Sequence, residues 1–200
     1  MVTFSEYLLD RIRGAKARFR PDWSDLAIVL NQLLFAYHCC IASEELLLDG
    51  AKAAESREDL FSRHLGTYYR AHFEEEKGEI ALLVKDLAFI GINPRASAPN
   101  PIAMGMIGSQ YYMIKHLHPV CLLGYMAVQE ADPTKVEVIE TLEEAHGKEL
   151  FSFLRLHAVK DLEHRKDLIA LIDQVPGALR QPVIESTDNA LAYLGRFYGG

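Results

Sequence analysis

Apolar residues recur every three or four positions through most of the chain, and glycine and proline fall mainly between these stretches. This periodicity predicts amphipathic α-helices. The helices are expected over about residues 3–19, 22–49, 56–90, 102–130, 133–173 and 184–197, from their caps and breakers. We expect Gly50 and Gly91 to end the second and third helices, with bends near His118-Pro119 and Gly147. No alternating strand pattern or internal repeat is visible. The sequence therefore predicts one all-α bundle over residues 1–200.

Composition and charge indicate which partners and which cellular location to expect. Half of the 200 residues are hydrophobic, the net charge is −7, and no basic run occurs, so nucleic acid and anionic membrane surfaces are not expected as partners. Seven of the first twenty residues are charged, which argues against a signal peptide, and no long apolar stretch lacks polar interruption. Cys39, Cys40 and Cys121 do not form a disulfide framework. These features predict a soluble cytoplasmic protein.

One segment near the C-terminus places metal-binding side chains on an apolar helix face. His157, Asp161 and His164 are separated by four and three residues, so they share one face of a helix. Leucine and isoleucine continue that face in both directions, whereas Lys160 and its charged neighbours are expected on the solvated faces. Buried imidazoles and carboxylates are costly without compensation, and a cation provides it. The alternative is a polar network or a solvated helix end.

Carboxylates occupy core-directed positions of other predicted helices. Glu76 and Glu79 follow His72 on one stripe, and Glu130 ends another. The second helix offers Glu44 or Glu45, between which the periodicity does not decide. Inward carboxylates from several helices together with imidazoles are what a dinuclear metal site in a bundle requires. An acidic, solvated surface remains the alternative for each carboxylate taken alone.

Three segments resemble the heme-oxygenase-like diiron oxidase superfamily: YYRAHFEEEKGEIALLVKDLAFIG, HPVCLLGYMAVQE and FLRLHAVKDLEH. Their order and approximate spacing agree with that family from about Leu26 to Ile172. The resemblance implies a heme-oxygenase-like or TenA-like bundle. It implies metal ligands at Glu76, Glu130, His157, Asp161 and His164. Where the family motif has a histidine ligand, this chain has Glu79, which can still ligate; His72 is a candidate substitute for the missing nitrogen.

The same resemblance implies an oxidase that uses two ferrous ions, or manganese, with dioxygen as cosubstrate. Its substrate would be a small organic molecule, amino-acid-like or fatty-acid-like, in a cavity lined by residues such as Tyr37, Tyr69, Leu123 and Met126. Metal-free thiaminase-like hydrolases share the fold, and Cys121 would be the candidate nucleophile. A non-enzymatic interaction protein is the third alternative. Bundles of this fold often dimerise, so a homodimer is compatible with the resemblance.

Overall fold

The computed structural model describes residues 2–132 and 134–199, and the side chains of residues 161–163 lie outside the description. The longer helices are α1 (Phe4–Lys16), α2 (Leu26–Glu55), α3 (Leu60–Glu76), α4 (Ile80–Phe89), α5 (Pro101–His116), α6 (Cys121–Glu130), α7 (Val136–His146), α8 (Ser152–Asp173) and α9 (Arg180–Gly199). Short 3₁₀ turns are η1 (Pro94–Ala96), η2 (Lys148–Leu150) and η3 (Gly177–Leu179). The described ranges contain no β-strand, which confirms the predicted all-α class.

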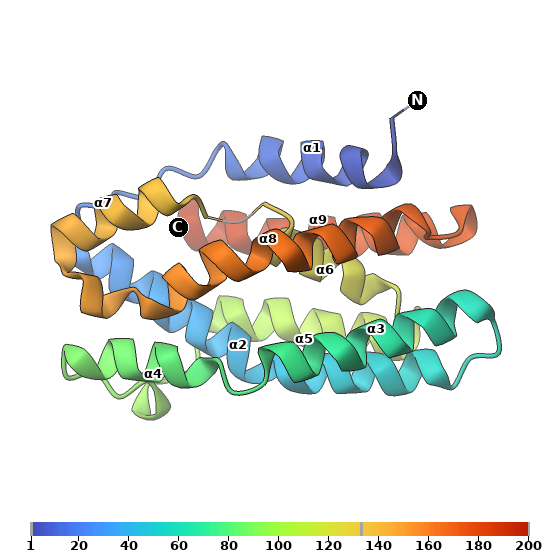
Figure 1. Cartoon of the computed structure of the whole chain (residues 1–200), viewed down its shortest axis with the longest axis horizontal. Coiled ribbons are helices and arrows are strands. Elements are labelled where there is room, and N and C mark those ends of the chain that lie inside the picture. Colours follow the sequence, from blue (N-terminus) through green and yellow to red (C-terminus); the bar gives the residue numbers. More distant parts are fainter. Residues whose placement is uncertain (1, 133, 200) are drawn as a thin grey trace.

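Most helices run along the long axis of the molecule (Figure 1). α2 packs against α3, α4 and α5, while α9 packs against α1, α5 and α6. Two apolar clusters result. The larger one joins α1, α3, α5, α6, α9 and the second half of α8, and the smaller one joins α4, α7, η2 and the beginning of α8. α2 contributes buried residues to both clusters.

The expected helix over residues 56–90 is broken in the middle. α3 ends at Glu76, Lys77 leaves the helical conformation, and Gly78 has a φ of +86° before α4 begins at Ile80. A positive φ carries little cost for glycine and is unfavourable for other residues. The prediction of one continuous helix was therefore wrong, and Glu79 lies at the N-terminus of a separate helix.

Gly50 does not end the second helix, contrary to the prediction. α2 continues through it to Glu55. A Cβ atom at Gly50 would lie 2.9 Å from Leu122 and 3.2 Å from Tyr69, so this glycine allows two neighbouring elements to approach α2. Close packing, rather than helix termination, explains the residue.

The two predicted bends are complete breaks. α5 ends at His116, and the buried His118 accepts a hydrogen bond through Nδ1 from the Val120 N–H at 3.0 Å before α6 begins. Burial lowers the pKa of His118 to about 4, with Arg57 acting in the same direction. Gly147, at a φ of +91°, separates α7 from η2 and α8. Both breaks turn the chain between packed helices.

The length and apolar composition of α2 would allow it to cross a membrane, although the sequence did not suggest a span there. The same properties belong to the central helix of a bundle. Here α2 packs against three other helices and supplies residues to both apolar clusters. Of its most apolar stretch, 33% is buried in the bundle, so packing accounts for part of this composition.

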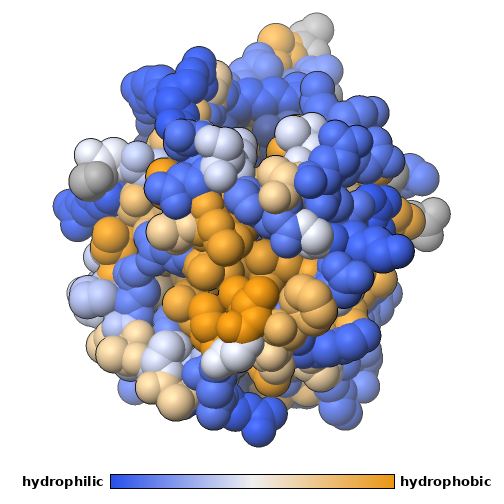
Figure 2. Space-filling model, turned by 90° about the vertical axis from the view of Figure 1, so that its left-hand side faces the viewer, coloured by the Kyte–Doolittle hydropathy of each residue, from blue (hydrophilic) through white to orange (hydrophobic). Residues whose placement is uncertain are grey.

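The end of the molecule that carries α7, the start of α2 and the end of α4 has an apolar surface area (Figures 1 and 2). Elements at this end expose Leu26, Ile28, Phe89 and Val138. Val138 also lines the internal cavity described below. The lining of the cavity therefore reaches this end of the bundle.

The beginning of α8 is capped by a residue of α4. Asp86 is fully buried and accepts hydrogen bonds from the Phe153 N–H, at 2.8 Å, and from the Ser152 hydroxyl. Asp86→Ala should lower the free energy of unfolding by about 1–3 kcal/mol, because it leaves the first turn of α8 without this acceptor. Urea denaturation measures the effect.

The neighbouring Lys85 is exposed, so Lys85→Ala is a matched control expected within about 0.5 kcal/mol of the wild type. Equal midpoints for the Asp86 and Lys85 variants would show that the buried carboxylate does not hold α8.

Candidate metal centre

The break between α3 and α4 lies opposite one face of α8, and carboxylates and imidazoles meet there. α3 supplies His72, Glu75 and Glu76, and Glu79 immediately precedes α4. α6 ends at Glu130. α8 supplies His157 and His164. Side chains from α3, α6, α8 and the start of α4, far apart in the sequence, thus lie close together in the bundle.

One group of donors, called here the His72 cluster, consists of His72, Glu75, Glu130 and His164. His72 Nε2 lies 3.2 Å from Glu130 Oε1, and His164 Nε2 lies 3.3 Å from Glu75 Oε2. One ligand atom from each of His72, Glu75 and His164 falls within 4.8 Å of the others. The two imidazoles are buried and Glu130 nearly so, whereas Glu75 is half exposed.

A second group, called here the Glu79 cluster, consists of Glu76, Glu79 and His157, which also offer ligand atoms within 4.8 Å of one another. His157 Nε2 lies 3.2 Å from Glu79 Oε2. Lys160 enters this cluster: its ammonium contacts Glu79 Oε1 and lies 3.4 Å from Glu76 Oε1. The expectation that Lys160 lies on a solvated face was wrong, since its side chain is only 25% exposed.

Glu76 joins the two clusters. Its Oε1 lies 3.3 Å from His164 Nδ1 on one side and 3.4 Å from Lys160 Nζ on the other. A carboxylate oxygen placed between two cationic or metal-binding groups can be shared by both. The two clusters consequently form one continuous polar layer.

The layer is rich in negative charge. Burial raises the pKa of Glu76, and the nearby Glu79 and Glu130 carboxylates add to this against the opposing effect of His157. Burial lowers the pKa of His72, but Glu130 and, more weakly, Glu76 raise it by more, so that the net direction is upward. Neighbouring carboxylates thus contribute to both shifts, although burial is the larger cause for Glu76, and this concentration of negative charge favours a bound cation.

The donors fit a hard divalent cation. Glu130 Oε2 is buried and makes no hydrogen bond among the described residues. Glu79 Oε2 is buried too and faces His157 Nε2 at 3.2 Å without forming a hydrogen bond. His164 Nδ1 is also buried and faces Glu76 at 3.3 Å without forming one. Buried polar atoms without partners are rare because each costs about 1–3 kcal/mol. Carboxylate oxygens and imidazole nitrogens that converge in this way match the ligand preferences of iron and manganese.

Most residues predicted from the sequence gather here. Glu76, Glu79, Glu130, His157 and His164 all lie in the two clusters. Asp161 was also predicted, but its side chain lies outside the described residues. His72, the candidate substitute nitrogen, lies here as well. The structure adds Glu75 and Lys160, which the sequence did not indicate.

Of the two candidates in α2, Glu44 and Glu45, only Glu44 faces the cavity. Glu45 is exposed, whereas Glu44 lines the cavity and accepts a hydrogen bond through Oε1 from the Gly78 N–H at 3.1 Å. Glu44 belongs to neither group of converging ligand atoms among the described residues. Its observed contact stabilises the break between α3 and α4.

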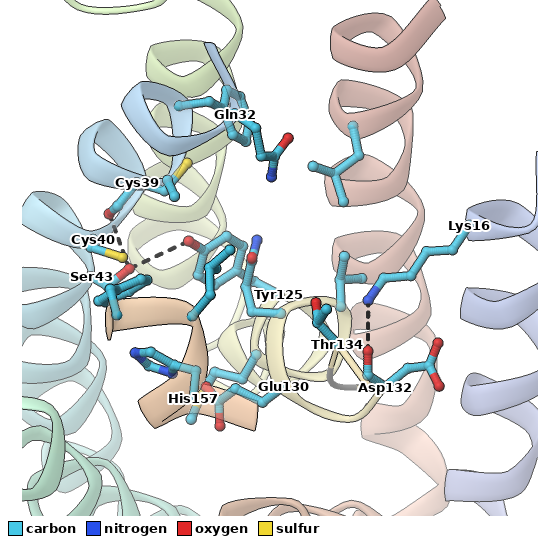
Figure 3. Close-up of a pocket in the computed structure, with 18 of the residues that line it drawn as sticks. Lys16, Gln32, Cys39, Cys40, Ser43, Tyr125, Glu130, Asp132, Thr134 and His157 are labelled. Carbon is cyan, nitrogen blue, oxygen red and sulfur yellow. Dashed lines mark hydrogen bonds between the residues drawn. The ribbon is translucent and has the colours of Figure 1, made fainter. Parts of the chain in front are cut away.

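An internal cavity of about 880 Å³ extends from this layer between α2, α6, α8 and α9. Figure 3 shows Glu130 and His157 near one end of its wall and Gln32 near the other. Between them, the Ser43 hydroxyl lies 3.4 Å from the Tyr125 hydroxyl. The remaining lining is largely apolar, with Phe35, Leu47, Met126, Phe153 and Leu194 among its residues. This size and lining are typical of small-molecule sites.

The predicted lining was only partly right. Met126 lines the cavity, but Tyr37, Tyr69 and Leu123 are not among its lining residues. Tyr69 is fully buried and donates its hydroxyl to the Pro119 carbonyl at 2.9 Å, which shows a structural role. Tyr125, which was not predicted, faces the cavity instead.

Cys121 is a poor candidate for a hydrolytic nucleophile. Its side chain is fully buried and is not part of the cavity lining. Burial raises the pKa of the Cys121 thiol to about 11, so the reactive thiolate is disfavoured near neutral pH. The thiaminase-like alternative therefore gains no support from this residue.

Comparisons with known proteins establish the fold. A crystal structure of a domain of unknown function with a heme oxygenase-like fold, from Shewanella denitrificans, superimposes with a TM-score of 0.59. The match covers 98% of this chain and 87% of that domain, at 17% sequence identity. No family model and no curated protein matches the sequence. The chain has a heme oxygenase-like fold, as the three sequence segments predicted.

Proposed function

We propose that this protein is a non-heme, metal-dependent oxidase that acts on a small organic molecule held in the cavity. The observation that carries the proposal is the position of the His72 cluster and the Glu79 cluster at one end of a largely apolar cavity. A fold alone does not define a function, so the proposal rests on these side chains and not on the likeness of the fold.

The His72 cluster would hold the metal ion. His72, Glu130 and His164 are its most buried members, and Glu75 and Glu76 place further oxygens beside His164. This mixed set of nitrogen and oxygen donors suits ferrous iron or manganese. The imidazole of His72 supplies the nitrogen that the family motif would have placed at position 79. The Glu79 cluster lies beside it, where the resemblance implies a second ion.

A bound ferrous ion would supply the capacity to react with dioxygen. The chain's own residues would orient the substrate and exclude water from it. The apolar wall favours a hydrocarbon-rich molecule, fatty-acid-like or amino-acid-like. Burial raises the pKa of Tyr125 well above its usual range, so its hydroxyl stays protonated and can donate a hydrogen bond to a substrate oxygen in the cavity.

Anaerobic reconstitution with ferrous iron tests the proposal. We expect iron to bind each chain and to raise the melting temperature, because a ligand that binds only the folded state stabilises it by about 2.7 kcal/mol at 100 times its Kd. Mixing the loaded protein with oxygenated buffer should then consume oxygen and change the visible spectrum.

Calcium serves as the control ion, because it prefers all-oxygen coordination and should stabilise the protein much less. A melting temperature that iron and manganese leave unchanged, together with no retained metal, would contradict the proposed function.

A further inference from the structure

The Lys160 ammonium is held by a complete set of acceptors. It donates to the Glu75 carbonyl oxygen and to Glu79 Oε1, and it lies 3.4 Å from Glu76 Oε1. A lysine ammonium has three N–H donors, so these three acceptors satisfy all of them. The side chain therefore has a defined place in the polar layer and is not a solvated surface group.

The position of this ammonium coincides with the Glu79 cluster. Two of the three residues of that cluster, Glu76 and Glu79, contact it directly. The third, His157, contacts the other oxygen of Glu79 at 3.2 Å. A metal ion bound by the same three residues would compete with Lys160 for both carboxylates, and two adjacent cations would repel each other.

The His72 cluster lacks such a counter-charge. No lysine or arginine is recorded within ion-pair distance of Glu130 among the described residues, and its Oε2 has no hydrogen bond. The two clusters thus differ in kind. In the Glu79 cluster, the Lys160 ammonium is the cation that balances the carboxylates. In the His72 cluster, the buried donors still require a cation.

We propose that the Lys160 ammonium takes the place of a second metal ion in the Glu79 cluster, so that each chain holds a single metal ion, in the His72 cluster. This inference rests on the proposed function, because it assumes that the His72 cluster binds metal. Lys160 then acts as a positioning residue: it neutralises Glu79 and fixes the shared Glu76 carboxylate toward His164. This number of metal ions, one per chain, differs from the two that the sequence resemblance implies.

Metal content per chain tests the inference directly. The wild type, loaded anaerobically with ferrous iron and freed of excess metal, should retain one ion. Lys160→Met keeps most of the volume and removes the charge, so it should retain two ions and show a larger metal-induced rise in melting temperature. Lys166→Met, an exposed position on the same helix, should retain one.

Glu79→Gln provides a test that does not require the lysine variant to fold. Because the inference makes Glu79 a partner of Lys160 and not a ligand of the retained ion, this variant should still retain one ion per chain, bound more weakly only in so far as Lys160 and Glu76 are less well fixed. Loss of the ion from a folded Glu79→Gln protein would overturn the inference.

The outcomes separate the two proposals. Two ions in the wild type, or one ion in both the wild type and a folded Lys160→Met variant, would overturn the role of Lys160 and leave the oxidase proposal standing. No retained ion in any variant would overturn the proposed function itself, and the role of Lys160 with it.

Discussion

His164→Ala should weaken the binding of ferrous iron by at least about 100-fold while leaving the bundle folded, since loss of even an outer partner of a metal site costs about 10–100-fold. Both ring nitrogens of His164 face carboxylate oxygens at 3.3 Å, and the ring lies 4.9 Å from that of His72. Removing the ring deletes a central donor of the His72 cluster. Elemental analysis after reconstitution, with circular dichroism to confirm helicity, measures the effect.

His64→Ala is the matched control. His64 is an exposed imidazole on α3, so its loss should leave metal content unchanged. His72→Ala should reproduce the result of His164→Ala, because the two imidazoles belong to the same cluster. A His164→Ala protein that retains the wild-type quantity of iron would show that α8 does not bind the metal.

The largest effect on stability is expected from Gly124→Ala. A Cβ atom at Gly124 would lie 2.3 Å from the Val183 carbonyl oxygen and 2.8 Å from the Thr187 nitrogen. Both are backbone atoms of α9, so α6 and α9 would have to move apart. Overpacking of this kind costs about 1–3 kcal/mol and sometimes more. The midpoint of urea denaturation should fall accordingly.

Gly108→Ala, in the middle of α5, is the comparison. No atom lies within 4 Å of a Cβ placed there, so this substitution should be neutral or stabilising by roughly 0.5–1 kcal/mol. If the two variants denatured at the same urea concentration, the contact between α6 and α9 would be less tight than the structure indicates.

The fold was predictable because hydrophobic periodicity determines which face of each helix is buried. The breaks were harder to predict. Gly50 and Gly78 look alike in the sequence, yet one lies inside a helix against Leu122 and Tyr69 and the other has a positive φ between two helices. Only the packing of neighbouring helices distinguishes a glycine needed for close approach from one needed for a turn.

The candidate site was predicted in outline for a similar reason. His157, Asp161 and His164 share a helix face, but so do His157, Lys160 and His164, which are three and four residues apart. Helix geometry therefore allowed Lys160 at the site, and only the usual preference of lysine for water excluded it. The preference failed because Glu76 and Glu79 reach the ammonium from across the bundle. Such partners come from tertiary structure and cannot be derived from one helix.

The polar layer lies where the two apolar clusters of the bundle meet. This position affects how parts of the bundle unfold locally. The two clusters share mainly α2 and α8, so we expect each to act as its own unit of local unfolding. An ion bound by α3, α6 and α8 would add a connection that exists only in the native state. Amide protons on either side of the layer would then exchange with solvent through a common opening event, and loading the metal would convert two loosely coupled units into one.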